Sequence, residues 1–69
     1  MKERDQQLLE FIKEFVTAHH FAPTYTEMME GIGEKSKNGI ARKLNRLESD
    51  GYIRRTSGKS RALIVESKN

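Results

Sequence analysis

The chain has 69 residues and no cysteine, so a single small domain must be held together by packing, without disulfides or thiolate metal sites. Below roughly 70–80 residues an apolar core contributes only about 3–5 kcal/mol net, and a ligand pocket of about 300–1,000 Å³ would take up much of that core. We therefore expect no enzyme, no catalytic residues and no cofactor. The chain contains no apolar run near the roughly 20 residues of a membrane span, and its first residues, MKERDQQ, lack the apolar stretch of a secretory signal. This predicts a cytoplasmic protein without a membrane partner.

The net charge of +3 is unevenly distributed along the chain. Residues 1–34 carry three cationic and seven acidic side chains, a net charge of −4, whereas residues 35–69 carry ten and three, a net charge of +7. A field this asymmetric orients a small domain toward a polyanion and speeds their encounter. The pattern favours a nucleic acid or another polyanion as the partner.

Residues 4–20 are predicted to form an amphipathic helix. Its apolar side chains recur at helical spacing and span an arc of about 160°, the width of a core-facing surface. The residues in this arc are Leu8, Leu9, Phe11, Ile12, Phe15, Val16 and His19. His19 and its neighbour His20 diverge by about 100° on a helix, so we expect no metal site from this pair.

A second helix is expected over residues 25–32, after the break in the pattern at Pro23. Thr24 and Glu27 have the spacing of a capping box, in which each side chain accepts a hydrogen bond from the other's backbone N–H. Gly33 suits the left-handed position just past the end of a helix. The second helix is therefore predicted to be short.

A third helix is expected over residues 37–50, with Ser36 as its N-cap. Ile40, Leu44 and Leu47 are spaced i, i+4 and i+7 and predict its buried stripe. Gly51 then ends the helical pattern.

The last part of the chain changes period. Residues 52–57 and 61–66 are β-favouring runs separated by three residues that include a glycine, which indicates a hairpin. Three helices, a short turn between the second and third, and a hairpin make a mainly α fold, the winged helix-turn-helix: a three-helix bundle with a two-stranded wing. We expect one such domain over residues 1–69.

The outward face of the third helix carries side chains that can read base edges in the major groove of double-stranded DNA. With the apolar stripe turned inward, Asn38, Arg42 and Asn45 point outward, and Lys35 and Arg46 lie on the flanks. Arginine can pair bidentately with guanine and asparagine with adenine.

Two further features have a functional and a structural interpretation. Gly39 costs the helix roughly 0.5–1 kcal/mol relative to alanine, which either close approach to DNA or tight packing explains. The basic hairpin residues Lys59 and Arg61 either contact phosphates or discourage edge-to-edge strand pairing. Arg54 and Arg55 point to opposite faces of a strand, so at most one of them can share the hairpin's DNA surface.

Three runs of residues resemble the N-terminal winged helix-turn-helix domain of the LexA repressor family. They are A-P-T-Y-T-E-M-M-E-G-I-G-E-K-S, then L-N-R-L-E-S-D-G-Y-I-R-R, then S-R-A-L-I-V, and the similarity extends from about Leu8 to Val65. The resemblance implies operator binding in bacteria or their phages, with the third helix in the major groove, the wing on the backbone and repression of transcription as the outcome. It also implies roles for Ser36 and Asn38 near the operator and for the positions of Gly39, Ala41 and Arg42 in base contact.

The chain departs from this family in two respects. Several family members have acidic residues or histidine where Ala41 and Arg42 stand, so a different operator sequence is expected. LexA-like repressors also continue into a domain that dimerises and cleaves its own linker, which 69 residues cannot supply.

Taken together, the residues and the family resemblance predict two sets of DNA contacts. The base-reading set is Asn38, Gly39, Ala41, Arg42 and Asn45. The backbone set is Thr24, Tyr25, Lys35, Ser36, Lys37, Arg46, Lys59, Ser60 and Arg61. For Tyr25 the alternative interpretation is an ordinary surface aromatic.

A lone module of this size buries only about 600–1,000 Å² on DNA, so a homodimer or a protein partner is expected to supply a second half-site. The alternative function is a protein-interaction module, in which the winged helix docks on a repressor or a polymerase subunit.

Overall fold

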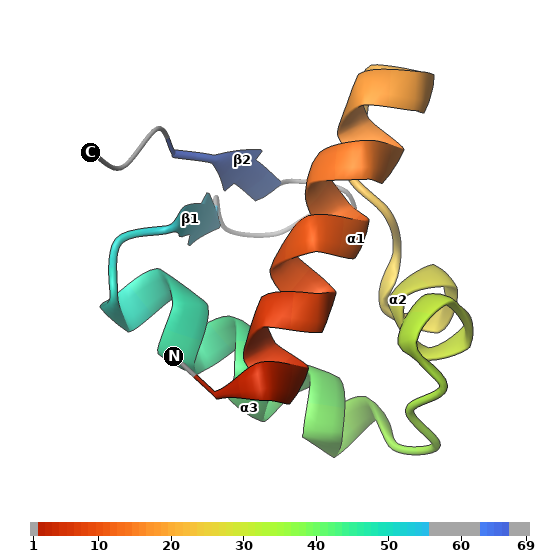
Figure 1. Ribbon diagram of the computed structural model, residues 1–69, viewed down its shortest axis with the longest axis vertical. Coiled ribbons are helices and arrows are strands. Elements are labelled where there is room, and N and C mark those ends of the chain that lie inside the picture. The colour runs from red at the N-terminus through yellow and green to blue at the C-terminus, as the bar shows by residue number, and fades with distance from the viewer. Residues whose placement is uncertain (1, 56–62, 67–69) are drawn as a thin grey trace.

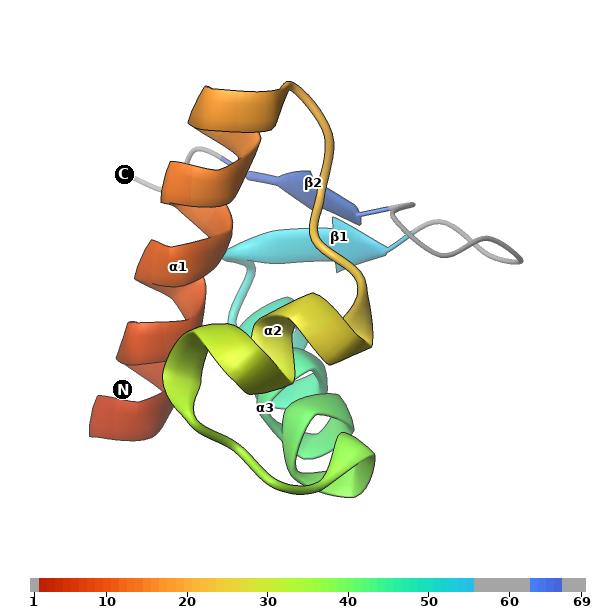
Figure 2. The ribbon, with the colours of Figure 1, turned by 90° about the vertical axis from the view of Figure 1, so that its right-hand side faces the viewer.

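The computed structural model describes residues 2–55 and 63–66 and has the predicted winged helix-turn-helix architecture. Helix α1 (Glu3–His19) stands upright in Figure 1, with α2 (Tyr25–Ile32) on one side and the hairpin on the other, and α3 (Lys37–Ser49) runs across its foot. Strands β1 (Ile53–Arg55) and β2 (Leu63–Val65) pair antiparallel, with Ile53 opposite Val65. Figure 2 shows α2 lying next to α3.

The core lies where the three helices and β1 meet. Leu8 and Ile12 of α1, Met28 of α2 and Ile53 of β1 are buried there against α3. The predicted α3 stripe, Ile40, Leu44 and Leu47, is fully buried in this core.

Helix α1 differs from the prediction at its C-terminal end. It was expected over residues 4–20 with His19 on the core face, but His19 is exposed and His20 already has a left-handed φ of 67°. His19 instead lies beside Phe15, with ring centroids 4.3 Å apart, and also contacts Phe21. The last turn of α1 extends beyond the elements that cover its middle, so helical spacing alone overestimates the length of its buried face.

Local hydrogen bonds define the ends of α2 and the start of α3. The Glu27 N–H donates to Thr24 Oγ1 at 3.2 Å and the Thr24 N–H donates to Glu27 Oε1 at 2.7 Å, which completes the predicted capping box. Gly33 ends α2 with a φ of 69°. Three residues later Ser36 caps α3 by accepting from the Gly39 N–H at 3.3 Å. The two helices are thus joined by a short turn, as a helix-turn-helix requires.

The hairpin was expected over residues 52–57 and 61–66, and the described strands are shorter, with three residues each. The connection between them, including Lys59, Ser60 and Arg61, lies outside the described residues. Helix α3 was expected to reach residue 50; Asp50 is its C-cap.

Candidate nucleic-acid interface

The outward face of α3 is polar and exposed. Asn38, Arg42, Asn45 and Ser49 are all exposed, on the side of the helix opposite Ile40, Leu44 and Leu47. Ala41 and Gly39 are half-buried at the two borders of this face. The structure thus brings the predicted base-reading residues together along one helix.

After its first residue, Lys37, helix α3 carries three cationic side chains, and their environments differ. Lys43 and Arg46 are paired with carboxylates, at 2.7 and 2.8 Å respectively. Arg42 is exposed, and among the described residues no hydrogen bond or ion pair of its guanidinium is seen. Of these three cations, Arg42 is therefore the one best placed to meet an external anion or base edge.

The turn before α3 presents polar groups at the helix N-terminus. Lys35, Ser36 and Lys37 are exposed, and the first turn of α3 contains no acidic residue. The backbone N–H groups and the positive end of the helix dipole at such a terminus favour an anion. Two lysines beside it add to that preference.

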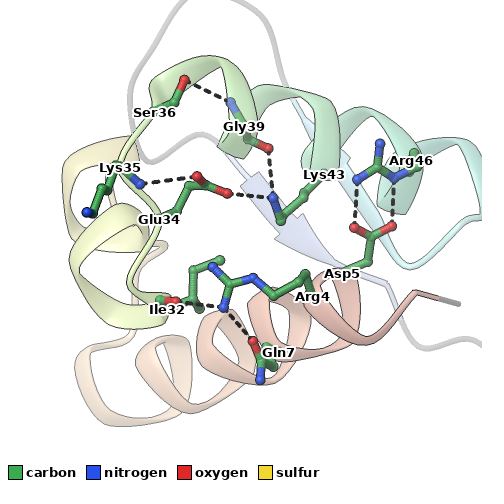
Figure 3. Close-up of polar contacts among 10 residues, drawn as sticks. All are labelled: Arg4, Asp5, Gln7, Ile32, Glu34, Lys35, Ser36, Gly39, Lys43 and Arg46. Carbon is green, nitrogen blue, oxygen red and sulfur yellow. Dashed lines mark hydrogen bonds and ion pairs between the residues drawn. The ribbon is translucent and has the colours of Figure 1, made fainter.

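Glu34 fixes this turn against α3 (Figure 3). Its Oε2 accepts from Lys43 Nζ at 2.7 Å, and its Oε1 accepts from the Lys35 N–H at 3.1 Å. The hydrogen bond from Lys43 is the main cause that lowers the pKa of Glu34, so the carboxylate is charged at neutral pH. The turn is therefore held in one conformation relative to α3.

Glu34 also explains the glycine at position 39. A Cβ added to Gly39 would lie 2.7 Å from Cδ of Glu34, so a larger residue would displace the carboxylate from its contacts. The packing interpretation of Gly39 thus has a named partner within the chain. Contact between Gly39 and DNA stays a prediction.

Arg46, a predicted backbone-contact residue, has a structural role (Figure 3). Its Nε and Nη2 donate to Oδ2 and Oδ1 of Asp5 at 2.8 and 2.9 Å. Asp5 is only 3% exposed, on the inner face of α1, and these hydrogen bonds are the main reason that its pKa lies below the ordinary value. The guanidinium therefore joins α1 to α3. A phosphate contact would use Nη1 or the second hydrogen of Nη2.

Arg4 forms a second connection from the first turn of α1. Its Nη1 donates to the carbonyl oxygen of Ile32 at 2.9 Å and to Gln7 Oε1 at 2.7 Å (Figure 3). The carbonyl at the end of α2 therefore has a cationic donor, which suits the negative end of a helix dipole.

Arg55, which the sequence interpretation did not assign to the site, contacts residues of the predicted interface. From β1 its side chain reaches Glu48 and Asn45 on α3, and its Nη1 donates to the phenolic oxygen of Tyr25 at 3.4 Å. The sequence placed Arg54 and Arg55 on opposite faces of the strand, and the structure agrees: Arg54 points outward, where it pairs with Glu66 at 3.6 Å. Strand alternation predicted the opposition but could not say which arginine faces α3.

Tyr25 lies next to this arginine at the start of α2, and Thr24 is the N-cap of the same helix. Thr24 Oγ1 accepts in the capping box, and its hydroxyl hydrogen can still donate. Tyr25 is half-buried against the core rather than a freely exposed aromatic, with its hydroxyl near Arg55. Each hydroxyl keeps a hydrogen that it could donate to a phosphate oxygen.

The acidic half of the sequence forms a different surface. An open groove between α1 and α2 is lined by Glu3, Glu10 and Glu14 together with Arg4, Phe11 and Gly31. Three acidic side chains thus gather along α1, whereas Asp5 and Glu34 pair with cations of α3.

The described part of the chain offers neither a metal site nor a membrane span. Residues 2–55 and 63–66 contain no group of three or more histidine, cysteine, aspartate or glutamate side chains that could hold a metal ion. No helix within these ranges is both long and apolar enough to cross a membrane.

The amino-acid sequence matches a known family over most of its length. The model of the LexA DNA-binding domain family matches residues 1–62. The chain belongs to this family. The family assignment agrees with the three helices and the antiparallel hairpin.

Curated relatives are longer proteins. The chain is 43% identical over 65 residues to the LexA repressor of Geobacillus thermodenitrificans, covering 94% of this chain and 31% of that protein. It is 40% identical over 65 residues to the LexA repressor of Pelagibacter ubique, covering 94% and 29%. With the LexA repressor of Sorangium cellulosum the identity is 38% over 63 residues, covering 91% and 27%. The chain therefore spans less than a third of the length of these relatives.

Proposed function

We propose that the protein binds double-stranded DNA sequence-specifically and regulates transcription, with α3 in the major groove and the hairpin on the phosphate backbone. The observation that carries the proposal is the exposed polar face of α3, where Asn38 and Arg42 are available while Lys43 and Arg46 are paired within the chain. Lys43 and Arg46 thus stabilise the fold, whereas Arg42 is exposed and can recognise a ligand. Membership of a DNA-binding domain family supports this assignment.

The chemistry of the face matches base edges. The planar guanidinium of Arg42 can donate two hydrogen bonds to guanine O6 and N7, and the amide of Asn38 can pair with adenine N6 and N7. The methyl group of Ala41 suits contact with a thymine methyl group. Gly39, at the border of the face, stays in the proposed base-reading set, although the Glu34 carboxylate already fills the space that its side chain would take.

Residues around this face are proposed to hold the backbone. Lys35, Ser36 and Lys37 surround the N-terminus of α3, and Thr24 and Tyr25 offer hydroxyl groups from α2. Arg46, through the N–H groups that Asp5 leaves free, and Lys59, Ser60 and Arg61 of the hairpin connection complete the proposed set. Phosphate contacts of this kind position the helix, and base contacts then provide specificity.

The relatives are named repressors, so we propose repression as the regulatory outcome. One module of this size buries only about 600–1,000 Å² on DNA, which favours a second copy or a protein partner on a neighbouring half-site.

Selection of bound sequences from a random duplex pool, followed by fluorescence anisotropy, tests the proposal. If about five phosphates are neutralised, log K should fall with log salt at a slope of about −4 to −5. Arg42→Met should lose discrimination at one base position by about 1–3 kcal/mol. Lys13→Met, which removes an exposed cation from α1, is the matched control and should keep the selected sequence. Absence of salt-sensitive binding below about 100 μM would contradict DNA binding.

The alternative of a protein-interaction module predicts a different result. Capture of a repressor or polymerase subunit that survives nuclease treatment, and that Asn38→Ala and Arg42→Ala leave unchanged, would favour it.

A further inference from the structure

Arg55 connects the hairpin to the proposed base-reading helix. The guanidinium lies partly buried between β1, α3 and the start of α2, with 28% of its side chain exposed. Its Nη2 donates to Oδ1 of Asn45, and its Nη1 donates to the hydroxyl oxygen of Tyr25 at 3.4 Å. Asn45 itself is exposed on the outward face of α3.

Glu48 holds this guanidinium in place. Glu48 Oε1 accepts from Arg55 Nε at 3.0 Å and from Nη2 at 2.9 Å, and Glu48 Oε2 accepts from the Arg55 backbone N–H at 3.1 Å. Two charge-assisted bonds to one carboxylate oxygen, with the other oxygen held by the backbone N–H, restrict both the position and the plane of this guanidinium. Arg55 is therefore a rigid donor beside Asn45 rather than a mobile surface cation.

A guanidinium has only donors, which decides the orientation of the Asn45 amide. The carbonyl oxygen Oδ1 must face Arg55, so the Nδ2 amino group is the end directed away from it. An asparagine that reads adenine bidentately needs both ends, because Oδ1 accepts from adenine N6 while Nδ2 donates to N7. The contact with Arg55 takes one of the two lone pairs of Oδ1 and turns that end of the amide toward the hairpin.

We propose that Arg55 is a positioning residue that fixes Asn45 as a hydrogen-bond donor toward DNA. Asn45 then reads a base acceptor, such as guanine O6 or N7 or thymine O4, instead of making the bidentate adenine contact expected of a free asparagine. The inference rests on the proposed function, since it specifies how one residue of the same DNA-binding face reads its base. It also makes base preference at one position depend on a residue of the hairpin.

Asn45→Asp tests the inference without disturbing the fold, because Asn45 is exposed and one oxygen of the new carboxylate could still accept from Arg55. The other oxygen would replace the Nδ2 donor with an acceptor. Sequence selection with the wild-type protein and with N45D should show the preferred base at one position changing from an acceptor-presenting base to cytosine or adenine, which present an amino group. The expected change in relative affinity, measured by anisotropy on the two duplexes, is about ten-fold.

Arg55→Met releases Asn45 and supplies the second arm of the experiment. In R55M the preference at that same position should move toward adenine, and this shift should vanish when Asn45→Ala is added. Arg54→Met is the matched control, since Arg54 is the neighbouring strand arginine and pairs with Glu66 instead. R54M should keep the base preference of the wild type. Circular dichroism confirms that each variant is folded under the binding conditions.

The outcomes separate the inference from the proposed function. If the wild-type protein shows no sequence-selective binding, both are overturned. If it binds selectively but N45D keeps the wild-type base preference, only the positioning role of Arg55 is overturned. An R55M shift that persists in the N45A background also overturns that role, because the shift would then arise from another residue.

Discussion

Replacing Arg46 with methionine removes the guanidinium that pairs with the buried carboxylate of Asp5 but keeps most of the aliphatic stem. Both Asp5 oxygens lose a donor, at 2.8 and 2.9 Å in the native structure. Hydrogen bonds to charged groups contribute about 1.5–3 kcal/mol, and removing one partner of a fully buried pair costs about 3–5 kcal/mol. Because 40% of the Arg46 side chain is exposed, water screens the pair. The cost should therefore fall in the lower half of the combined range of about 1.5–5 kcal/mol. We expect R46M to lower the free energy of unfolding by about 2–3 kcal/mol.

Two further variants show whether the carboxylate is the cause. Asp5→Asn keeps the shape and one acceptor, and the arginine that it leaves behind can turn to water, so it should cost less than R46M. Arg42→Met removes an exposed arginine one turn earlier in the same helix and should change stability by no more than about 0.5 kcal/mol. Urea denaturation followed by circular dichroism at the helical band measures all three, since most of the described chain is helical.

The pH dependence gives a second test of the same pair. Hydrogen bonds from Arg46 lower the pKa of Asp5 below its ordinary value of 3.8. The native carboxylate therefore binds a proton less readily than the unfolded one, so its contribution to stability is complete above about pH 4 and disappears as the pH falls through the lower native pKa. The stability difference between the wild-type protein and D5N should be constant near neutrality and shrink in acid.

The reasoning would be refuted if R46M and R42M had the same urea midpoint, or if D5N were more damaging than R46M. A difference between wild type and D5N that grew as the pH was lowered would refute the sign of the linkage.

Two more perturbations test local features of the fold. Thr24→Ala removes the capping box and should cost about 1 kcal/mol in urea denaturation, whereas Thr26→Ala at the next exposed threonine should stay within about 0.5 kcal/mol. Gly31→Ala should destabilise by about 1–3 kcal/mol despite its better helix propensity, because the new Cβ would lie 2.3 Å from Cε1 of Phe11. In a Phe11→Ala background the same change should instead gain up to about 1 kcal/mol, and a loss there would show that the ring is not the obstacle.

Several features of the site could have been recognised from sequence spacing. Asp5 lies three and four positions before Leu8 and Leu9, in the middle of the apolar arc of α1, and a carboxylate there requires a partner. Lys43, three residues after Ile40, is placed on the border of the buried stripe by the same argument. The pattern was therefore present, but the partners were not identifiable from it.

The partners depend on contacts between distant segments. Asp5 and Arg46 are 41 positions apart, and Arg55 meets Tyr25 across 30. Such pairs form only when the packing angles between helices, and the side on which the hairpin returns, are set. For that reason the sequence did not reveal that Arg46 pairs with Asp5 or that Arg55 contacts Tyr25. The backbone contact of Arg46 stays a prediction.

The amino-acid sequence by itself determined the local events: the capping box at Thr24, the left-handed end at Gly33, the stripe of α3 and the change of period before the hairpin. These follow from backbone hydrogen bonds and side-chain spacing within a few residues, which the sequence states directly. Only the tertiary structure decided which cations form internal pairs and which remain for a ligand. That division depends on which charges packing brings within hydrogen-bonding distance of one another. Packing joins residues that are far apart in the sequence, and sequence spacing does not identify such partners.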